Sequence, residues 1–281
     1  MMKIFPKISE GQIPDRMKEI ISTKEGIEIQ FFDEAGPTES FNFEEQVTRR
    51  KEEFPNLKEI IIHPPLNNYN IEFLLLKDES MVEDIFTRLA NLSKKLDIHI
   101  SYVAHTYLNT VLFKSLNVDK KMGKYLKILE GSNVTILLEN MFMVLDERRE
   151  CAVINIAKMM DHPNLRVCID TTHAHIKSTI WKIPFEEMIK SDATPEDCNK
   201  YVRQIHFASQ LENDGYIEKI THGRVHSSIE DVEKEISWLR NLNMFDDKHI
   251  ITEVSEDDYS TRVNQIKEIE MLEEAYKKEE L

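Results

Sequence analysis

The feature of this sequence that most constrains its fold is a regular alternation of short apolar runs with longer amphipathic segments. The amphipathic segments place apolar residues at spacings of three and four, as helices that cover a core do. They include residues 79–97, 228–245 and 259–281. Eight apolar runs alternate with such segments, at residues 3–8, 26–32, 57–63, 98–105, 134–139, 165–170, 202–206 and 249–253.

Eight strand–helix units in one chain predict an α/β protein that folds as a single (β/α)8 TIM barrel over residues 1–281. The runs are mostly apolar, as strands are when both faces of a parallel sheet are covered. A doubly wound open sheet is the alternative, because it is built from the same repeating unit. The strand count favours the barrel.

Composition narrows the class of protein. The formal net charge of -15 disfavours non-specific binding to nucleic acid or to an anionic membrane, since both depend on clustered lysine and arginine. The three cysteines form no CxxC pair, which favours a reducing compartment over a disulfide framework. The N-terminal segment lacks the pattern of a signal peptide, and no apolar run approaches the ~20 residues of a membrane-spanning helix. We therefore expect a soluble, cytoplasmic protein without membrane partners. The oligomeric state is left open.

Six of the predicted strands end in a residue that can bind a metal ion. In a barrel the carboxyl ends of the strands converge on one face, where active sites of this fold lie. Side chains alternate between the two faces of a strand, so Asp170 lies on the face of Cys168 and Glu139 on that of Leu137. The apolar residues of the opposite face are left to meet the helices, which directs these two carboxylates toward the barrel axis. The six residues are His63, His105, Glu139, Asp170, His206 and Glu253.

A metal ion explains this set better than separate structural roles do. One histidine or carboxylate at a strand end is more often a hydrogen-bonding residue or a helix cap. Several carboxylates at one face would repel one another, and a divalent cation removes that repulsion. Mixed His, Asp and Glu ligands suit Zn²⁺ or Mn²⁺. The sequence contains neither a phosphate-binding glycine loop nor a G-x-S-x-G nucleophile elbow.

These residues resemble a known family. Glu139, Asp170, His206 and Glu253 are similar in order and spacing to the metal-binding tetrad of the xylose isomerase-like TIM barrels, over nearly the whole chain. That superfamily includes sugar isomerases and epimerases as well as the endonuclease IV group of enzymes that cleave DNA at abasic sites. The segment "CIDTTHAH" resembles the D-T-x-H-A segment of the endonuclease IV (AP endonuclease family 2) branch. "LLEN" resembles its E-N segment, and the two strand-end histidines match its histidines on strands three and four.

The resemblance implies up to three ions of Zn or Mn. The first would be held by His63, His105 and Glu139, and the second by the four residues of the tetrad. His173, together with the loop after the seventh strand, would hold the third. In that loop the branch has Asp-x-His, whereas this chain has Arg224, Val225 and His226. His226 is the preferred ligand there, His222 is the substitute, and Arg224 and His222 are candidate substrate-binding residues.

The same site suits two reactions. In a hydrolase of endonuclease IV type, two or three ions would activate water against a phosphoester, such as abasic DNA, and Arg224 would bind the phosphate. In a sugar or sugar phosphate isomerase or epimerase, one ion would hold the sugar while Glu139 and Glu253 move its proton as base and acid. Because positions 63 and 105 are histidines, the hydrolase is the first prediction and the isomerase the alternative. A barrel that keeps the metal site as a binding or regulatory module is a third.

Overall fold

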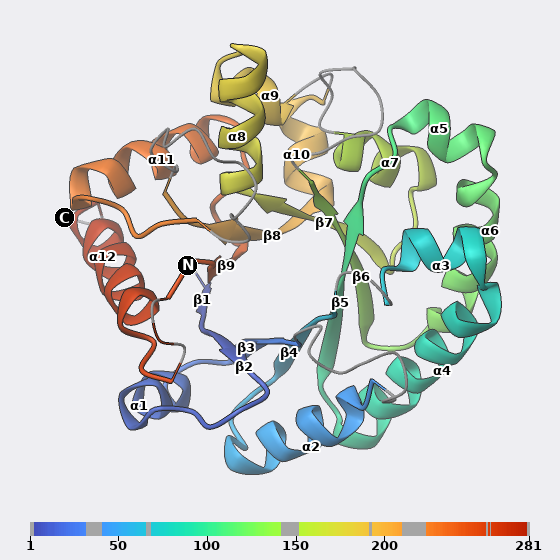
Figure 1. Cartoon of the computed structure of the whole chain (residues 1–281), viewed down its shortest axis with the longest axis horizontal. Helices are drawn as coiled ribbons and strands as arrows, with labels where there is room; N and C mark the ends of the chain where they lie inside the picture. Colours follow the sequence, from blue (N-terminus) through green and yellow to red (C-terminus); the bar gives the residue numbers. More distant parts are fainter. Residues whose placement is uncertain are drawn as a thin grey trace.

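The computed structural model describes residues 3–31, 41–65, 69–141, 152–190, 193–209, 223–256, 258 and 260–279. Nine parallel strands form one sheet that closes almost completely into a barrel, and helices surround it (Figure 1). The strand order is β1-β9-β8-β7-β6-β5-β4-β3-β2. The strands are β1 Lys3–Phe5, β2 Lys7–Ser9, β3 Gly26–Gln30, β4 Glu59–His63, β5 His99–Thr106, β6 Val134–Asn140, β7 Leu165–Asp170, β8 Val202–Phe207 and β9 His249–Thr252. The predicted TIM barrel is confirmed.

The ninth strand arises because the first predicted strand is divided in two. Pro6 separates β1 from β2, and a proline has no N–H to continue a strand ladder. Strand β1 pairs with β9, whereas β2 pairs with β3 on the other side. The carbonyl of Pro6 accepts a hydrogen bond from Glu28 N at 2.9 Å. The divided segment therefore joins the two ends of the sheet, which is how this barrel closes.

Helices lie outside the strands, and their ends follow local capping rules. The Asp78 side chain accepts a hydrogen bond from Ser80 N at the start of α4, and Asp97 ends that helix in the left-handed conformation. The last helix, α12, begins at Val263 rather than near residue 259, because Arg262 has a φ of 57°. The helices are α1 Asp15–Ser22, α2 Phe43–Glu53, α3 Ile71–Lys77, α4 Glu79–Leu96, α5 Thr110–Ser115, α6 Val118–Leu126, α7 Ala152–Met160, α8 Thr171–Trp181, α9 Phe185–Lys190, α10 Pro195–Tyr201, α11 Ile229–Asn241, α12 Val263–Glu279, and the 3-10 helix Lys127–Leu129.

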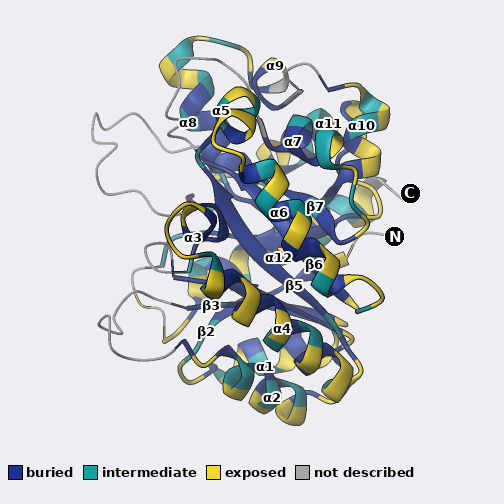
Figure 2. Ribbon diagram, turned by 90° about the vertical axis from the view of Figure 1, so that its right-hand side faces the viewer, coloured by how far each residue is buried: buried dark blue, intermediate teal, exposed yellow. Residues whose placement is uncertain are grey.

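The apolar core has two parts. In Figure 2 the buried strands, in dark blue, are enclosed by helices whose outer faces are exposed. The outer part fills the space between sheet and helices and includes Ile136 and Ile169. The inner part lies within the barrel and includes Leu137 and Cys168. This division confirms the predicted alternation. Glu139 and Asp170, two residues further along β6 and β7, consequently point to the barrel interior.

Two further expectations concern the environment of the chain. Cys168 and Cys198 are buried and form no disulfide, and Cys151 lies outside the described residues. Within the described ranges, no helix combines the length and the apolar character needed to cross a membrane.

Candidate metal centre

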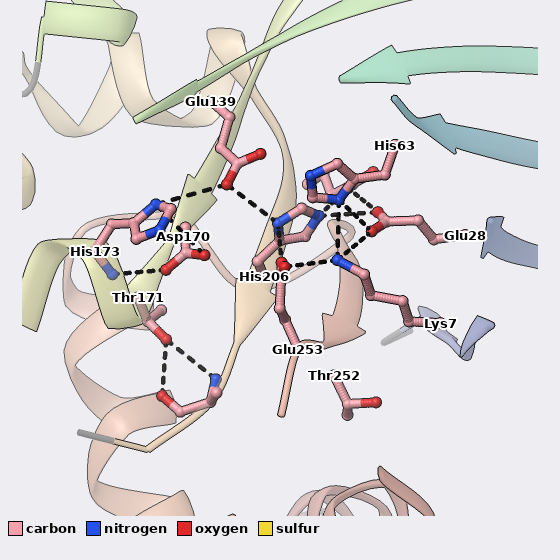
Figure 3. Close-up of polar contacts among 12 residues, drawn as sticks. Lys7, Glu28, His63, Glu139, Asp170, Thr171, His173, His206, Thr252 and Glu253 are labelled. Carbon is pink, nitrogen blue, oxygen red and sulfur yellow. Dashed lines mark hydrogen bonds and ion pairs between the residues drawn. The ribbon is translucent and has the colours of Figure 1, made fainter. Parts of the chain in front are cut away.

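The structure brings the six predicted strand-end ligands together at the carboxyl end of the barrel. Five of them lie within strands β4 to β8, and Glu253 directly follows β9. All six residues are buried, and Figure 3 shows the carboxylate and imidazole groups of His63, Glu139, Asp170, His206 and Glu253 gathered around one space. They form part of three groups whose ligand atoms lie within 4.8 Å of one another.

The three groups overlap in their members. The tetrad is Glu139, Asp170, His206 and Glu253. The histidine trio is His63, His105 and Glu139, and it therefore shares one carboxylate with the tetrad. The Glu28 group is Glu28, His63, His206 and Glu253. The overlap means that the three groups are parts of one polar interior, not three separate sites.

The tetrad concentrates negative charge in a buried space. Burial raises the pKa of Asp170 to about 6, and the nearby carboxylates of Glu253 and Glu139 act in the same direction. Burial also works against ionisation of Glu139, but the charges of His105 and His206 outweigh it and lower its pKa to about 2. Glu139 Oε2 is buried and makes no hydrogen bond among the described residues. A cation would compensate this charge and supply the missing partner.

His206 has the orientation that a metal-binding histidine requires. Its Nε2 donates a hydrogen bond of 2.9 Å to Glu28 Oε2, so its other nitrogen is directed to the tetrad. That Nδ1 lies 3.5 Å from Glu139 Oε1 and forms an ion pair with Glu253 Oε2. Burial lowers the pKa of His206, but the neighbouring anionic groups outweigh it and raise the pKa well above its usual value. A divalent ion would displace the Nδ1 proton. The tetrad thus fits Zn²⁺ or Mn²⁺ in both charge and ligand type.

Asp170 has a second, local role. It is the N-cap of α8, and its Oδ1 accepts a hydrogen bond of 2.7 Å from His173 N. The segment "VCIDTTHAH" therefore ends a strand and starts a helix at one residue. One carboxylate oxygen fixes the helix, which leaves Oδ2 on the side of the tetrad.

His173 lies beside the tetrad but belongs to none of the three groups. Its Nδ1 donates to the carbonyl oxygen of Asn140 at 2.8 Å and lies 3.6 Å from both Glu139 Oε1 and Asp170 Oδ2. Because a carbonyl oxygen only accepts, Nδ1 carries a proton. Binding of a further ion by His173 stays a prediction.

The predicted loop ligand His226 does not lie with the tetrad. The structure places His226 in a separate buried network, where Nδ1 contacts Glu268 Oε1 and Nε2 lies 3.1 Å from Glu235 Oε2. Burial lowers the pKa of His226, but its bonds to Glu235 and Glu268 outweigh that effect and raise it to about 9. The carboxylates come from α11 and α12, and no local pattern around His226 predicts that they contact this histidine. His222 lies outside the described residues.

Arg224 lies on the rim of the carboxyl end. Its neighbour Gly223 forms a bridge with Val254, directly after the tetrad residue Glu253, and Arg224 itself pairs with Ser209 through the backbone. The residue is exposed. It is therefore placed where a group of a bound substrate could meet it, and its binding role stays a prediction.

Sequence reasoning missed two charged residues in the barrel interior, Lys7 on β2 and Glu28 on β3. Glu28 is fully buried and contacts Lys7, His63, His206 and Gln204. Burial lowers the pKa of Lys7, but the charges of Glu253 and Glu28 outweigh it and raise the pKa above its usual value. The available signal was a charged residue inside each of two short apolar runs, "KIS" and "GIEIQ".

Comparison with known proteins places the fold. No protein-family model matches the sequence, and no curated protein matches it either. Solved structures do match. A D-tagatose 3-epimerase-like protein has a TM-score of 0.59 and 18% identity, with 99% of this chain and 97% of that chain covered. The IOLI protein with a zinc atom has a TM-score of 0.58 and 13% identity, with 98% and 96% covered.

A xylose isomerase domain-containing protein from Salmonella typhimurium has a TM-score of 0.61 and 13% identity, with 97% of this chain and 96% of that chain covered. At these identities the likeness concerns the fold. The chain therefore shares the TIM-barrel fold of these structures.

Proposed function

We propose that this protein is a metal-dependent isomerase or epimerase of sugars or sugar phosphates, with one divalent ion held by the tetrad. The observation that carries this proposal is the position of Glu139 and Glu253 as buried carboxylates of the same four-residue group. The similar structures support it, since they include an epimerase-like protein and a xylose isomerase domain. This reverses the order of the two predicted reactions.

A divalent ion in the tetrad would polarise the oxygens of a bound sugar and make the neighbouring C–H more acidic. The chain itself then has to move a proton. Glu139 and Glu253 are the two carboxylates suited to take the proton from carbon and to return it. His173 lies beside Glu139, and Arg224 lies on the rim, so both residues are candidates to bind substrate hydroxyl or phosphate groups. Burial of the tetrad excludes bulk water from the carbon being deprotonated.

Solvent-proton exchange tests this function. Protein loaded with Mn²⁺ is incubated in D2O with a panel of ketoses, aldoses and their phosphates, and deuterium in the sugar is followed by NMR. We expect exchange and isomerisation of at least one sugar. The matched variant Glu139→Gln keeps the shape of the side chain and should lower the rate by about 100-fold or more, because it removes the base. Unchanged exchange in Glu139→Gln would contradict the assignment.

A second candidate function is the phosphoester hydrolase. The observation that favours it is the histidine trio, whose carboxylate Glu139 is shared with the tetrad, as a bridging ligand between two ions would be. Cleavage of DNA containing an abasic site, without exchange in any sugar, would support the hydrolase instead. We further propose a cytoplasmic location, which the reduced state of Cys168 and Cys198 supports.

A further inference from the structure

The ammonium group of Lys7 lies inside the Glu28 group. Its Nζ is 2.6 Å from Glu253 Oε1, 3.0 Å from Glu28 Oε1 and 2.9 Å from His63 Nδ1 (Figure 3). These three atoms belong to three of the four residues that could otherwise hold an ion there. An ammonium has three donors, so each of its hydrogens has an acceptor.

Burial of the Lys7 ammonium costs free energy unless neighbouring negative charges compensate it. Its side chain is 2% exposed, and burial of an unpaired ammonium is strongly unfavourable. The compensation comes from the carboxylates of Glu28 and Glu253, which are themselves buried and need a positive charge. Lys7 therefore supplies at this place the charge that a metal ion would supply. It does so next to the tetrad, because Glu253 belongs to both groups.

Lys7 also contacts a residue of the histidine trio. His63 Nδ1 lies within hydrogen-bonding distance of both the Lys7 ammonium, at 2.9 Å, and Glu28 Oε1, at 3.0 Å. The Nε2 atom of the same ring faces His105 Nε2 at 3.0 Å. A divalent ion held by the histidine trio would therefore lie beside a buried ammonium, and repulsion between the two positive charges disfavours it.

We propose that the Lys7 ammonium is the resident second cation of this centre and limits it to one metal ion. Removal of the ammonium would open a second metal site at Glu28, His63 and Glu253. The inference rests on the single ion proposed above for the tetrad. It explains how a barrel with histidines at positions 63 and 105 can work as a one-metal enzyme.

Metal content tests the proposal independently of activity. Wild type, Lys7→Met and Lys7→Arg are saturated with Mn²⁺, freed of unbound ion by gel filtration, and analysed for manganese per chain. We expect one ion in wild type and in Lys7→Arg, which keeps the positive charge. We expect two ions in Lys7→Met, which keeps the length of the side chain but not the charge. The double variant Lys7→Met/Glu28→Gln should return to one, because Glu28 is a candidate ligand in the new site only, while glutamine keeps an oxygen that can accept the hydrogen bond from His206 Nε2.

The outcomes separate this inference from the proposed function. A folded Lys7→Met that still binds one ion overturns the role of Lys7 and leaves the tetrad intact. Two ions in wild type also overturn it and favour the hydrolase. A wild type that binds no ion overturns the proposed function together with the inference. If Lys7→Met does not fold, as judged by circular dichroism, Lys7→Gln takes its place and is read in the same way.

Discussion

The side chain of Asn140 forms two hydrogen bonds with the backbone of Asp170. Its Nδ2 donates to the carbonyl oxygen of Asp170 at 3.0 Å, and its Oδ1 accepts from Asp170 N at 2.7 Å. Asn140 is the last residue of β6 and directly follows Glu139. These two hydrogen bonds therefore fix the ends of two neighbouring strands at the point where each contributes a carboxylate to the tetrad. The backbone carbonyl oxygen of Asn140 also accepts a hydrogen bond from His173 Nδ1 and so orients that ring.

Replacement of Asn140 should consequently weaken metal binding as well as stability. Asn140→Ala removes two hydrogen bonds, which contribute about 1 kcal/mol each. Because the two carboxylates lose their alignment, we expect metal affinity to fall by about 10- to 100-fold. Calorimetric titration with Mn²⁺ measures this. The matched control is Asn164→Ala, which also removes two hydrogen bonds, to Leu129 O and Val134 O, but at the opposite end of β6. Equal loss of affinity in both variants would contradict the alignment role.

The two roles of Asp170 can be separated by two substitutions. Asp170→Asn keeps an oxygen that can cap α8 but removes the charge, so we expect lost metal binding with little change in stability. Asp170→Ala removes both the capping oxygen and the charge, and we expect an additional loss of about 1 kcal/mol in the free energy of unfolding. Elemental analysis and urea unfolding provide the two measurements. A fully metallated, active Asp170→Ala would rule out Asp170 as a ligand.

Removal of metal should lower the stability of the protein. Without a cation, the buried carboxylates of the tetrad lack the charge that compensates their mutual repulsion. An ion present at 100 times its dissociation constant would stabilise the fold by about 2.7 kcal/mol. We expect the melting temperature to fall with EDTA and to recover with Mn²⁺. Glu139→Gln should not respond in this way, and an equal response in that variant would place the ion elsewhere.

The His226 network should make stability depend on pH. The pKa of His226 is raised to about 9 in the folded protein, against about 6.5 in an unfolded chain. Its stabilising contribution is therefore complete below about pH 6.5 and is lost as the pH rises through 9. His226→Gln should cost about 3 kcal/mol at pH 6 and much less near pH 10. Urea unfolding of both proteins at the two pH values measures this difference.

The exposed pair of Lys200 and Asp161 provides the control for that measurement. Lys200→Ala should change stability little at either pH, because exposed ion pairs contribute little. If the gap between wild type and His226→Gln were the same at pH 6 and pH 10, the charge of His226 would have no part in the stability of the network.

Gly223 should not tolerate a side chain. A Cβ at this position would overlap Thr172 Oγ1 and Ala208 Cβ, since the backbone of the bridge packs directly on α8 and the end of β8. Gly223→Ala should therefore destabilise the fold by about 1–3 kcal/mol and displace Arg224 from the rim. Gly11→Ala, where a Cβ meets nothing within 4 Å, is the control. Thermal unfolding tests the first effect, and an unchanged melting temperature in Gly223→Ala would contradict it.

The sequence by itself determined the architecture and most of the candidate ligands. Strand alternation has a period of two, so the inward direction of Glu139 and Asp170 could be derived from their own neighbours, Leu137 and Cys168. The barrel then brings strand ends together wherever they stand in the chain. For that reason six residues from six strands could be assigned to one face before any distance was known.

Only the tertiary structure determined which oppositely charged residues contact Lys7 and His226. Lys7 and Glu253 stand 246 residues apart, and His226 and Glu268 stand 42 apart. A local pattern shows that a charged side chain enters the interior, but not which opposite charge meets it there. Pro6 marks a break in its strand, yet the pairing of its two halves with β9 and β3 depends on closure of the whole sheet. Charge pairing and closure act between distant segments, so they arise only when the chain has folded.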